Sequence, residues 1–472
     1  MKLYEAYAQE IAQLIHDRVL RAGERIPSVR QAAHKRKLSP GTVLQAYSLL
    51  EDRGLIEARP RSGYYVSPHW DRLPPEPEMT RPSTRSAAVD ISDLVFSILE
   101  STKNRKVVPL GSAFPSPLLF PLRQLSTALA SATRRLDPWR TVEDLPPGSR
   151  DLRRLVARRY AEEGLSISPE QLVITSGAME ALNLCLQAVT RPGDIVAVEA
   201  PAFYAPLQAI EAYGLRAVEI PTDPREGVDI PALARALDTH PIKACWFMSN
   251  FQNPLGSLMP DAHKEALVGL LARHGVPLIE DDVYNELYLG SGKPKPAKAF
   301  DEAGMVMHCS SFSKCLAPGY RVGWVAAGRF AEAVHRRKLM STLSASIPAQ
   351  VGIAEYLKHG GFERHLRRLR QALASQQSLM LQSIARHFPS GTRLTRPKGG
   401  YLVWVELPVG IDALEVHRQA MERGISVAPG PMFSAKRAYR NCLRINYGHP
   451  FMDEMEAGVA EVGAITTSLA QR

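Results

Sequence analysis

The chain has 472 residues, which exceeds the roughly 100 to 200 of an ordinary domain and predicts more than one domain. Its content of 45% hydrophobic and 22% charged residues is that of a globular protein and excludes extensive disorder. No apolar run approaches the ~20 residues that span a bilayer, the N-terminal segment is too charged for a signal peptide, and the five cysteines include no CxxC pair. We therefore expect a cytoplasmic protein with no membrane partner and no metal site, while the net charge of +10 permits an anionic partner such as nucleic acid.

Residues 1–70 predict three helices followed by a β-hairpin. The first helix is expected to run to Gly23, Ser28 can cap a second helix, and Ser39 can cap a third. Two short β-like runs follow the third helix and are joined by RPRSG. Three helices with a terminal hairpin predict a winged helix-turn-helix domain.

Basic side chains in this domain lie where a DNA reader needs them, around the turn before the third helix and on the wing. A helix whose N-terminus enters the groove, flanked by phosphate-binding cations, is the footprint of such a reader. The alternative is a solvated charged face on a small helical bundle. The candidate DNA-binding residues are Arg30, Lys35, Arg36, Ser39, Thr42, Gln45, Arg59 and Arg61.

Residues 71–90 form a proline-rich linker. They contain few apolar residues, no hydrophobic period and four prolines, Pro74, Pro75, Pro77 and Pro82. Such segments are semi-rigid and extended. The two flanking parts of the chain can therefore lie well apart.

Residues 91–472 alternate helical segments with short apolar strands, among them QLVIT, DIVAVE, ACWFMS, PLIEDD and MVMHCS. This alternation predicts an α/β fold with a mixed, mostly parallel central sheet that is covered by helices on both faces. The large part is expected at about 107–340. A small C-terminal α+β subdomain, with the strands YLVWVEL and CLRINYG, is expected at about 341–472.

A single lysine, Lys314, lies among hydroxyl-bearing residues in SSFSKCLAPGYRVGW, directly after a predicted strand. Ser311, Ser313 and Arg321 surround it in the sequence. A helix that starts after QLVIT offers backbone N–H groups that could hold a phosphate, at Ser176, Gly177 and Ala178. Because ligands gather at the carboxyl ends of parallel strands, these groups are expected to meet in one crevice.

Further polar residues end neighbouring strands. PLIEDD ends in Asp281 and Asp282, Tyr284 follows, and Asn253 lies in FQNPLG. Pyridoxal 5′-phosphate (PLP) needs such a set: a lysine for a Schiff base, an anion for its ring nitrogen, donors for its phenolic oxygen, a phosphate cradle and a stacking ring. Phe203 in EAPAFYA could supply the ring.

Five segments, ITSGAMEALNL, FQNPLG, LIEDDVY, SSFSKCLAPGYRVGW and CLRINYG, resemble in this order the fold-type I aminotransferases of the aspartate aminotransferase class. The resemblance runs from about Val107 to the C-terminus. It implies PLP as the cofactor and Lys314 as the catalytic residue that forms the imine. It further implies that Asp282 pairs with the ring nitrogen, that Asn253 and Tyr284 contact the phenolic oxygen, that Arg321, Ser311 and Ser176 hold the phosphate, and that Arg444 binds a substrate carboxylate.

Four of these assignments have alternatives. Arg444 could be a structural ion pair, and Tyr204 could replace Phe203 as the stacking ring. Asp281 competes with Asp282, which is preferred because the tyrosine follows it by two residues. Other members of the class space acid and phenol by three residues, which would put Asn285 at the phenol position.

The segments IPSVRQAA, LSPGTVLQAYSLLEDRGLI and ARPRSGYYV resemble the winged helix of GntR-family regulators, and the order of the domains resembles the MocR subfamily. In many relatives an arginine follows the serine that opens the third helix, whereas here Pro40 follows Ser39. Arg30, Thr42 and Gln45 would then carry more of any base readout.

These resemblances imply a PLP-dependent transcriptional regulator. It would bind double-stranded promoter DNA as a homodimer and sense a small acidic molecule that bears an amino group. The alternative is an active PLP-dependent aminotransferase that carries a DNA-binding module, since no residue forbids turnover. A third reading is a large domain that serves as a ligand-free scaffold.

Overall fold

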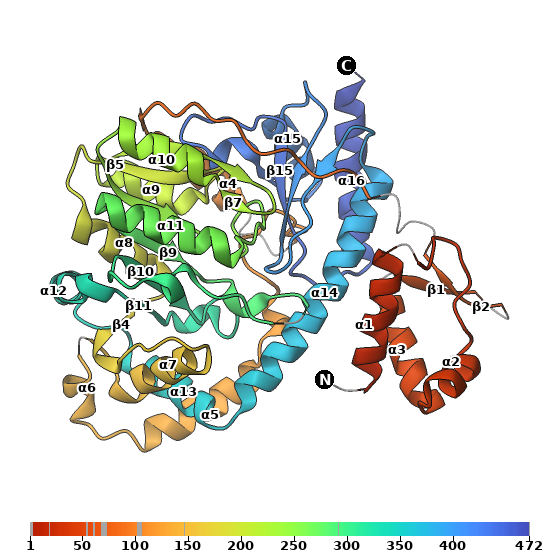
Figure 1. Cartoon of the computed structure of the whole chain (residues 1–472), viewed down its shortest axis with the longest axis horizontal. Coiled ribbons are helices and arrows are strands. Elements are labelled where there is room, and N and C mark those ends of the chain that lie inside the picture. Colours follow the sequence, from red (N-terminus) through yellow and green to blue (C-terminus); the bar gives the residue numbers. More distant parts are fainter. Residues whose placement is uncertain are drawn as a thin grey trace.

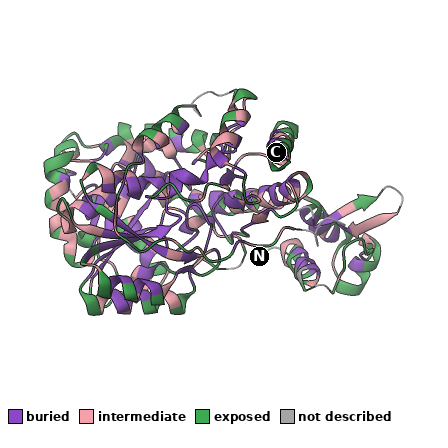
Figure 2. Ribbon diagram, turned by 90° about the horizontal axis from the view of Figure 1, so that it is seen from above, coloured by how far each residue is buried: buried purple, intermediate pink, exposed green. Residues whose placement is uncertain are grey.

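The computed structural model describes residues 3–17, 19–52, 55–59, 62–67, 73–101, 106–145, 147–290 and 292–471. An N-terminal helical module with a hairpin lies beside a much larger α/β unit (Figure 1). Each has its own buried interior (Figure 2). Within these described ranges, no helix combines the length and the apolar character that a membrane crossing requires.

The N-terminal module is a winged helix, as the sequence predicts. It consists of α1 (Leu3–His16), α2 (Val29–Arg36), α3 (Pro40–Asp52) and the antiparallel strands β1 (Ile56–Arg59) and β2 (Gly63–Val66). The predicted serine caps are present, since Ser28 Oγ accepts from the Gln31 N–H and Ser39 Oγ accepts from the Thr42 N–H. The first helix ends at His16 rather than at Gly23, because Val19 is 62% exposed and adds nothing to the buried face.

A core substitution in α3 tests whether this module has a stability of its own. Leu50 is fully buried in the cluster around Tyr47, whereas Leu44 on the same helix is 49% exposed. Leu50→Ala is expected to lower the free energy of unfolding of the module by about 2 to 5 kcal/mol, because it leaves a cavity. Leu44→Ala is the matched control and should change that free energy by less than about 0.5 kcal/mol. Chemical denaturation of the two purified variants measures both changes in the free energy of unfolding. Equal changes in the two variants would contradict the packing described.

The large unit is built on a sheet of order β3-β6-β5-β8-β9-β10-β11-β4, with β7 paired to β6. The strands β6, β5, β8, β9 and β10 pair with one another in parallel. The short strands β3 and β7 are antiparallel to β6, and β11 is antiparallel to both β10 and β4. The sheet is therefore mixed and mostly parallel, which confirms the predicted fold class. Its strands are β3 (Ala87–Ala88), β4 (Leu172–Thr175), β5 (Ile195–Ala200), β6 (Arg216–Asp223), β7 (Gly227–Val228), β8 (Ile242–Phe247), β9 (Leu278–Asp281), β10 (Val306–Ser311) and β11 (Gly323–Ala326).

Helices cover both faces of this sheet (Figure 1). Successive residues of β5, such as Val196 and Ala197, belong to different hydrophobic clusters on the two faces of the sheet. Because both faces are buried, the strands are apolar throughout. The helices of this part are α4 (Ser92–Ser101), α5 (Leu122–Arg134), α6 (Arg140–Glu143), α7 (Arg150–Glu162), α8 (Ala178–Val189), α9 (Tyr204–Ala212), α10 (Ile230–Thr239), α11 (Asp261–His274), α12 (Ala331–Ser341) and α13 (Ile347–Lys358).

The small C-terminal subdomain is α+β, as expected. Its antiparallel sheet has the order β12-β13-β15-β14, with β12 (Arg393–Leu394), β13 (Leu402–Glu406), β14 (Ala428–Pro429) and β15 (Cys442–Asn446). Its helices are α14 (Gly361–His387), α15 (Ala413–Glu422) and α16 (Asp453–Ala470). The long helix α14 runs from the end of α13 to α16, along one side of the large unit (Figure 1).

Candidate functional site

Lys314 follows β10 and lies close to residues of both subdomains, among them Ala113, Asp281, Arg321 and Arg444; we call these surroundings the crevice. Its Nζ donates to the Ala113 carbonyl at 2.8 Å and lies 3.7 Å from the centre of the Phe114 ring. Burial, followed by the positive charge of Arg444, lowers the pKa of Lys314 to about 7, although Asp281 opposes the shift. An amine that is about half neutral at pH 7 is a competent nucleophile. Lys314 is therefore no ordinary surface lysine.

A cradle for an anion lies beside this lysine. Arg321 has a left-handed backbone, and its guanidinium lies 3.5 Å from Ser313 Oγ and 3.3 Å from the Ser176 carbonyl. Ser311 Oγ accepts from the Ser313 N–H. Helix α8 begins at Gly177 with no side-chain cap, so its first N–H groups point out of the helix toward this cradle. The structure thus brings together the candidate phosphate-binding residues that the sequence singled out.

Two of the predicted donors are already used. The Ser176 N–H donates to Glu180 Oε2 at 2.6 Å, and Glu180 in turn binds Lys338 Nζ at 2.7 Å. The Gly177 N–H donates to the Thr175 carbonyl at 2.8 Å, so the N–H groups available to an anion begin at Ala178.

The two adjacent carboxylates have different surroundings. Asp281 ends β9, and its Oδ1 is buried without a hydrogen-bond partner among the residues described. Burial and then the neighbouring charge of Asp282 raise the pKa of Asp281 to about 7, whereas Lys314 acts to lower it. An unsatisfied carboxylate oxygen close to Lys314 is the group that a protonated ring nitrogen requires.

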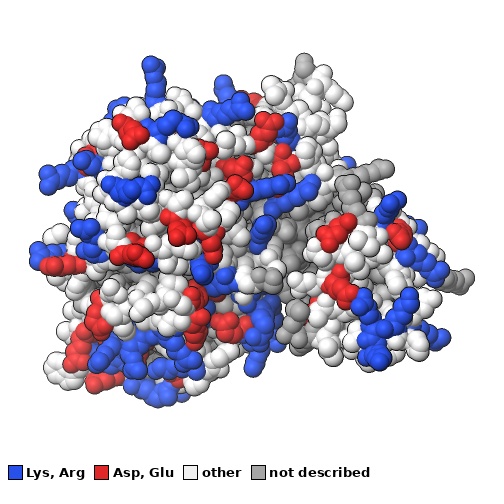
Figure 3. Space-filling model, viewed as in Figure 1, with Lys and Arg blue, Asp and Glu red and all other residues white. Residues whose placement is uncertain are grey.

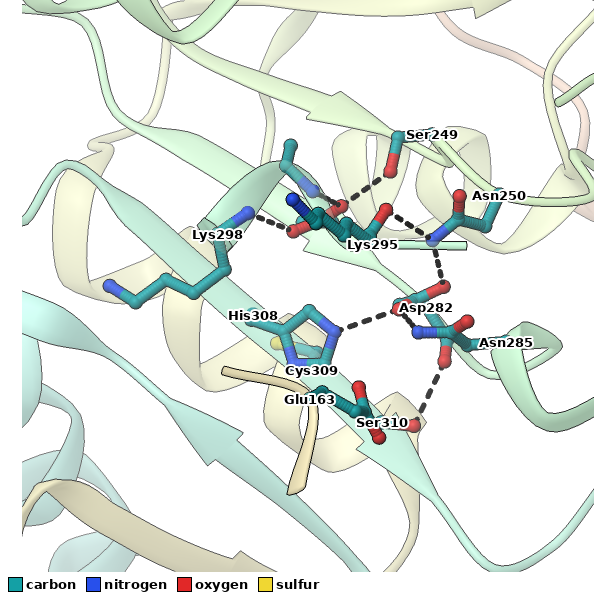
Figure 4. A network of polar contacts seen from close by, with 12 residues as sticks. Glu163, Ser249, Asn250, Asp282, Asn285, Lys295, Lys298, His308, Cys309 and Ser310 are labelled. Carbon is teal, nitrogen blue, oxygen red and sulfur yellow. Dashed lines mark hydrogen bonds and ion pairs between the residues drawn. The ribbon is translucent and has the colours of Figure 1, made fainter. Parts of the chain in front are cut away.

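Both carboxylate oxygens of Asp282 have hydrogen-bond partners (Figure 4). Its Oδ1 accepts from Asn250 at 3.1 Å, and its Oδ2 accepts from Asn285 at 2.7 Å and lies 2.9 Å from His308 Nε2. Successive residues of an extended strand point to opposite faces, so only one of the two acids can face the crevice. The assignment of the ring nitrogen to one of the two acids stays a prediction, and the geometry favours Asp281 over Asp282.

His308 is held by a chain of hydrogen bonds. Trp324 Nε1 can only donate, and it donates to Tyr160 Oη at 2.9 Å. The Tyr160 hydroxyl lies 2.6 Å from His308 Nδ1, and His308 Nε2 lies 2.9 Å from Asp282 Oδ2. Sequence reasoning missed this network, although a histidine inside the apolar strand MVMHCS was a signal for it.

The phenol and amide positions lie together. Asn253 Nδ2 donates to Tyr284 Oη at 3.5 Å, and the Tyr284 ring packs edge-on against Tyr401 with ring centres 5.3 Å apart. Burial raises the pKa of Tyr284 to about 12, so the phenol remains a donor at neutral pH. Asn285 is bound to Asp282, and this removes the alternative that placed it at the phenol position.

Arg444 is a fully buried arginine on β15 without a carboxylate partner among the described residues. Its Nη2 donates to the Gly111 carbonyl at 2.7 Å, its Nη1 donates to Asn253 Oδ1 at 3.3 Å, and its Nε has no partner there. Burial lowers the pKa of Arg444. The alternative of a structural ion pair is therefore contradicted, and the guanidinium is available for the carboxylate of a ligand.

Phe203 and Tyr204 lie side by side, with ring centres 4.3 Å apart. Tyr204 is 8% exposed and packs against Phe433, whereas Phe203 is only partly buried. The more accessible ring is that of Phe203, which favours it for stacking on a cofactor.

The described candidate DNA-binding residues lie on α2, on α3 with the turn before it, and, for Arg59, on β1; basic side chains gather over this module (Figure 3). Arg30, Lys35 and Gln45 are exposed, and Thr42 is partly exposed at the start of α3, where its hydroxyl lies 2.8 Å from that of Ser39. Arg36 pairs with Glu10, and Arg59 pairs with Glu57 at 2.7 Å, so these two cations would exchange an internal partner for a phosphate. Arg61 lies outside the described residues.

Comparisons with known proteins find matches for both the N-terminal module and the large unit. Residues 3–66 match the bacterial regulatory proteins of the gntR family, and residues 125–460 match the class I and II aminotransferases. The chain is 46% identical to the uncharacterized HTH-type transcriptional regulator YdcR of Escherichia coli, over 98% of this chain and 99% of that protein.

The large unit is also similar to enzymes. The 2-aminoadipate transaminase of Thermus thermophilus is 31% identical over 78% of this chain and 92% of the enzyme. The solved structure of the α-aminoadipate aminotransferase LysN of T. thermophilus, complexed with N-(5′-phosphopyridoxyl)-L-leucine, matches with a TM-score of 0.72 at 29% identity, over 81% of this chain and 100% of that chain. The multiple substrate aminotransferase of Thermococcus profundus matches with a TM-score of 0.73 at 27% identity, over 80% of this chain and 95% of that chain.

The residues around Lys314 fit PLP, because the crevice offers an amine, a free carboxylate oxygen, phenol and amide donors and an anion cradle. The aminotransferase match and the solved neighbours indicate the same cofactor. The chain belongs to the class I and II aminotransferase family and, through its gntR-family DNA-binding domain, to the MocR type of bacterial regulators.

Proposed function

We propose that the chain is a homodimeric, cytoplasmic transcriptional regulator whose large unit senses a small molecule with an amino group and a carboxylate. The observation that carries this proposal is the unpaired, buried guanidinium of Arg444 in the same crevice as Lys314, within a chain that begins with a DNA-binding domain. A buried charge without a partner is costly for folding, so its retention favours a role in binding.

Each residue of the crevice has a distinct role in the proposal. Asp281 holds the ring nitrogen of PLP, Asn253 and Tyr284 contact its phenolic oxygen, and Phe203 stacks on the ring. Arg321, Ser311, Ser313 and the first N–H groups of α8 hold the phosphate. PLP supplies an aldehyde on which the amine of Lys314 can be exchanged for the amine of the effector. Arg444 then orients the effector through its carboxylate.

DNA affinity measured by fluorescence anisotropy tests the proposal directly. The probe is a duplex from the region upstream of the gene, and the additions are PLP and single amino acids. At least one amino acid is expected to change the dissociation constant about fivefold or more, because effector coupling typically amounts to 1 to 3 kcal/mol. Lys314→Ala should abolish this change while still binding the duplex. A wild-type protein that binds the duplex equally well under all conditions contradicts the proposal, as does a monomer in sedimentation experiments.

An active aminotransferase is the second candidate. Similarity to the 2-aminoadipate transaminase favours it, and an amine with a pKa of about 7 is suited to moving a proton at the Cα of an amino acid. Repeated conversion of many equivalents of amino acid and keto acid distinguishes this candidate from a sensor, which stops after one equivalent.

A substitution at Gly177 tests the phosphate cradle. A Cβ atom at this position would lie 2.6 Å from Arg321 Nη2, and the residue has a φ of +85°. Gly177→Ala is therefore expected to displace the guanidinium and to weaken PLP binding by about tenfold or more, which corresponds to ~1.4 kcal/mol. The control is Gly193→Ala, which has a similar φ of +91° but no atom within 4 Å of the added methyl group. Equal PLP affinity in both variants would show that the cradle does not hold the phosphate.

A further inference from the structure

The described part of the linker, residues 73–90, does not hang free between the two units. It lies extended along the large unit (Figure 1), and we call it the strap. Its prolines keep the backbone extended, since each fixes φ and removes an N–H donor. A segment of this kind transmits a displacement rather than absorbing it. This differs from the expected spacer that holds the two units apart.

The strap is anchored to the large subdomain at Thr80. The Thr80 hydroxyl donates to the Ala200 carbonyl at 2.5 Å and accepts from the Thr222 N–H at 2.9 Å, while the Thr80 N–H donates to the Thr222 carbonyl at 3.2 Å. Glu76 pairs with Arg225 on the same subdomain. Further along, β3 adds a short edge strand to β6.

The same strap is anchored to the small subdomain at other positions. The Pro75 carbonyl accepts from the Leu394 N–H at 2.9 Å, and Glu78 lies 3.3 Å from Arg393. Lys436 Nζ donates to the carbonyls of Ser83 and Arg85, at 2.7 and 2.9 Å. Anchors to the two subdomains therefore alternate along the strap, so a shift of one subdomain against the other must move it.

These anchors lie next to the proposed effector site. Ala200, which binds Thr80, is three residues before Phe203. Lys436 is three residues after Phe433, whose ring lies 5.2 Å from the Arg444 guanidinium. Toward the DNA-binding module, only residues 68–72 separate the strap from Ser67, so the connection can reach at most about 20 Å.

We propose that the strap couples the relative position of the two subdomains, and with it occupancy of the crevice, to the placement of the winged helix. This inference rests on the proposed function, since it requires an effector that bridges Lys314 on the large subdomain and Arg444 on the small one. The effector shifts the balance only as far as it binds one arrangement better than the other.

Thr80→Val tests the strap because it removes the hydroxyl and keeps the shape of the side chain. PLP loading and the effector dissociation constant, both measured from the cofactor absorbance, are expected to stay within twofold of wild type. The effector-dependent change in DNA affinity should fall to less than twofold. The control is Thr84→Val, on the same strap with an exposed side chain that forms no hydrogen bond among the described residues, and it should keep the full response.

Hydrogen exchange gives a second measurement that does not depend on a variant. Effector binding to the full-length PLP-loaded protein is expected to change the protection of the Thr80, Thr222 and Leu394 amides. Full coupling in Thr80→Val, or unchanged protection of these amides, overturns the inference. A wild-type protein whose DNA affinity ignores every effector instead refutes the proposed function, so the two failures are distinguishable.

Discussion

Apoprotein mixed with PLP is expected to form a covalent adduct at Lys314 at a rate that rises with pH around a midpoint near 7. Burial and the charge of Arg444 lower the pKa of Lys314 to about 7. Below this pH the group is an ammonium and cannot attack the aldehyde, and above it the free amine dominates. At pH 7.5 an ordinary lysine with a pKa of ~10.4 is only ~0.1% neutral, so Lys314 should react several hundred times faster than such a lysine.

Stopped-flow absorbance gives the rate, and borohydride trapping followed by peptide mapping identifies the modified residue. Lys314→Ala should show no covalent adduct and only reversible PLP binding. The control is Lys243→Ala, which removes an exposed lysine of β8 in the same subdomain and should leave both rate and midpoint unchanged. A midpoint near 10, or an adduct elsewhere in the chain, contradicts the role assigned to Lys314.

The proximity of the candidate site residues could be predicted from the sequence because they follow strand ends, and strand ends converge wherever a parallel sheet forms. Lys314 and Arg321 follow β10, Asn253 follows β8 and Asp281 ends β9, and they lie around one crevice. The winged helix was predictable for a different reason, since its caps at Ser28 and Ser39 are local signals.

The choice between Asp281 and Asp282 could not be read from the sequence in the same way. Two adjacent acids at a strand end have opposite orientations, and their spacing to a tyrosine does not say which faces the ligand. The structure favours Asp281 through the donors around Asp282, which come from residues 250, 285 and 308. Contacts of this range have no local signature.

Main-chain groups of the crevice were also beyond prediction. The Gly111 and Ala113 carbonyls accept from Arg444 and Lys314, yet a carbonyl carries no residue-type signal. The strap was misjudged for a related reason. Its composition indicated extension correctly, but the anchors at Pro75 and Ser83 are backbone carbonyls that bind side chains and amides far along the chain.

Arg444→Lys is expected to weaken effector binding at least about 30-fold while PLP loading continues. A lysine keeps the positive charge but loses the planar fork that binds a carboxylate with two hydrogen bonds. Loss of a buried, charge-assisted pair costs about 2 kcal/mol or more, which sets this lower limit. The control is Arg423→Lys, since Arg423 is 48% exposed and pairs with Glu461 on the surface of the small subdomain.

Comparison with Arg444→Gln separates charge from geometry at the same position. Because the charge of Arg444 helps to lower the pKa of Lys314, its removal in Arg444→Gln should move the midpoint of PLP capture to higher pH. Arg444→Lys retains the charge and should leave that midpoint nearly unchanged. Both variants are expected to bind the effector more weakly, but only Arg444→Gln is expected to raise the pKa of Lys314. If effector affinity survives in both, the carboxylate binds elsewhere and the crevice serves the cofactor alone.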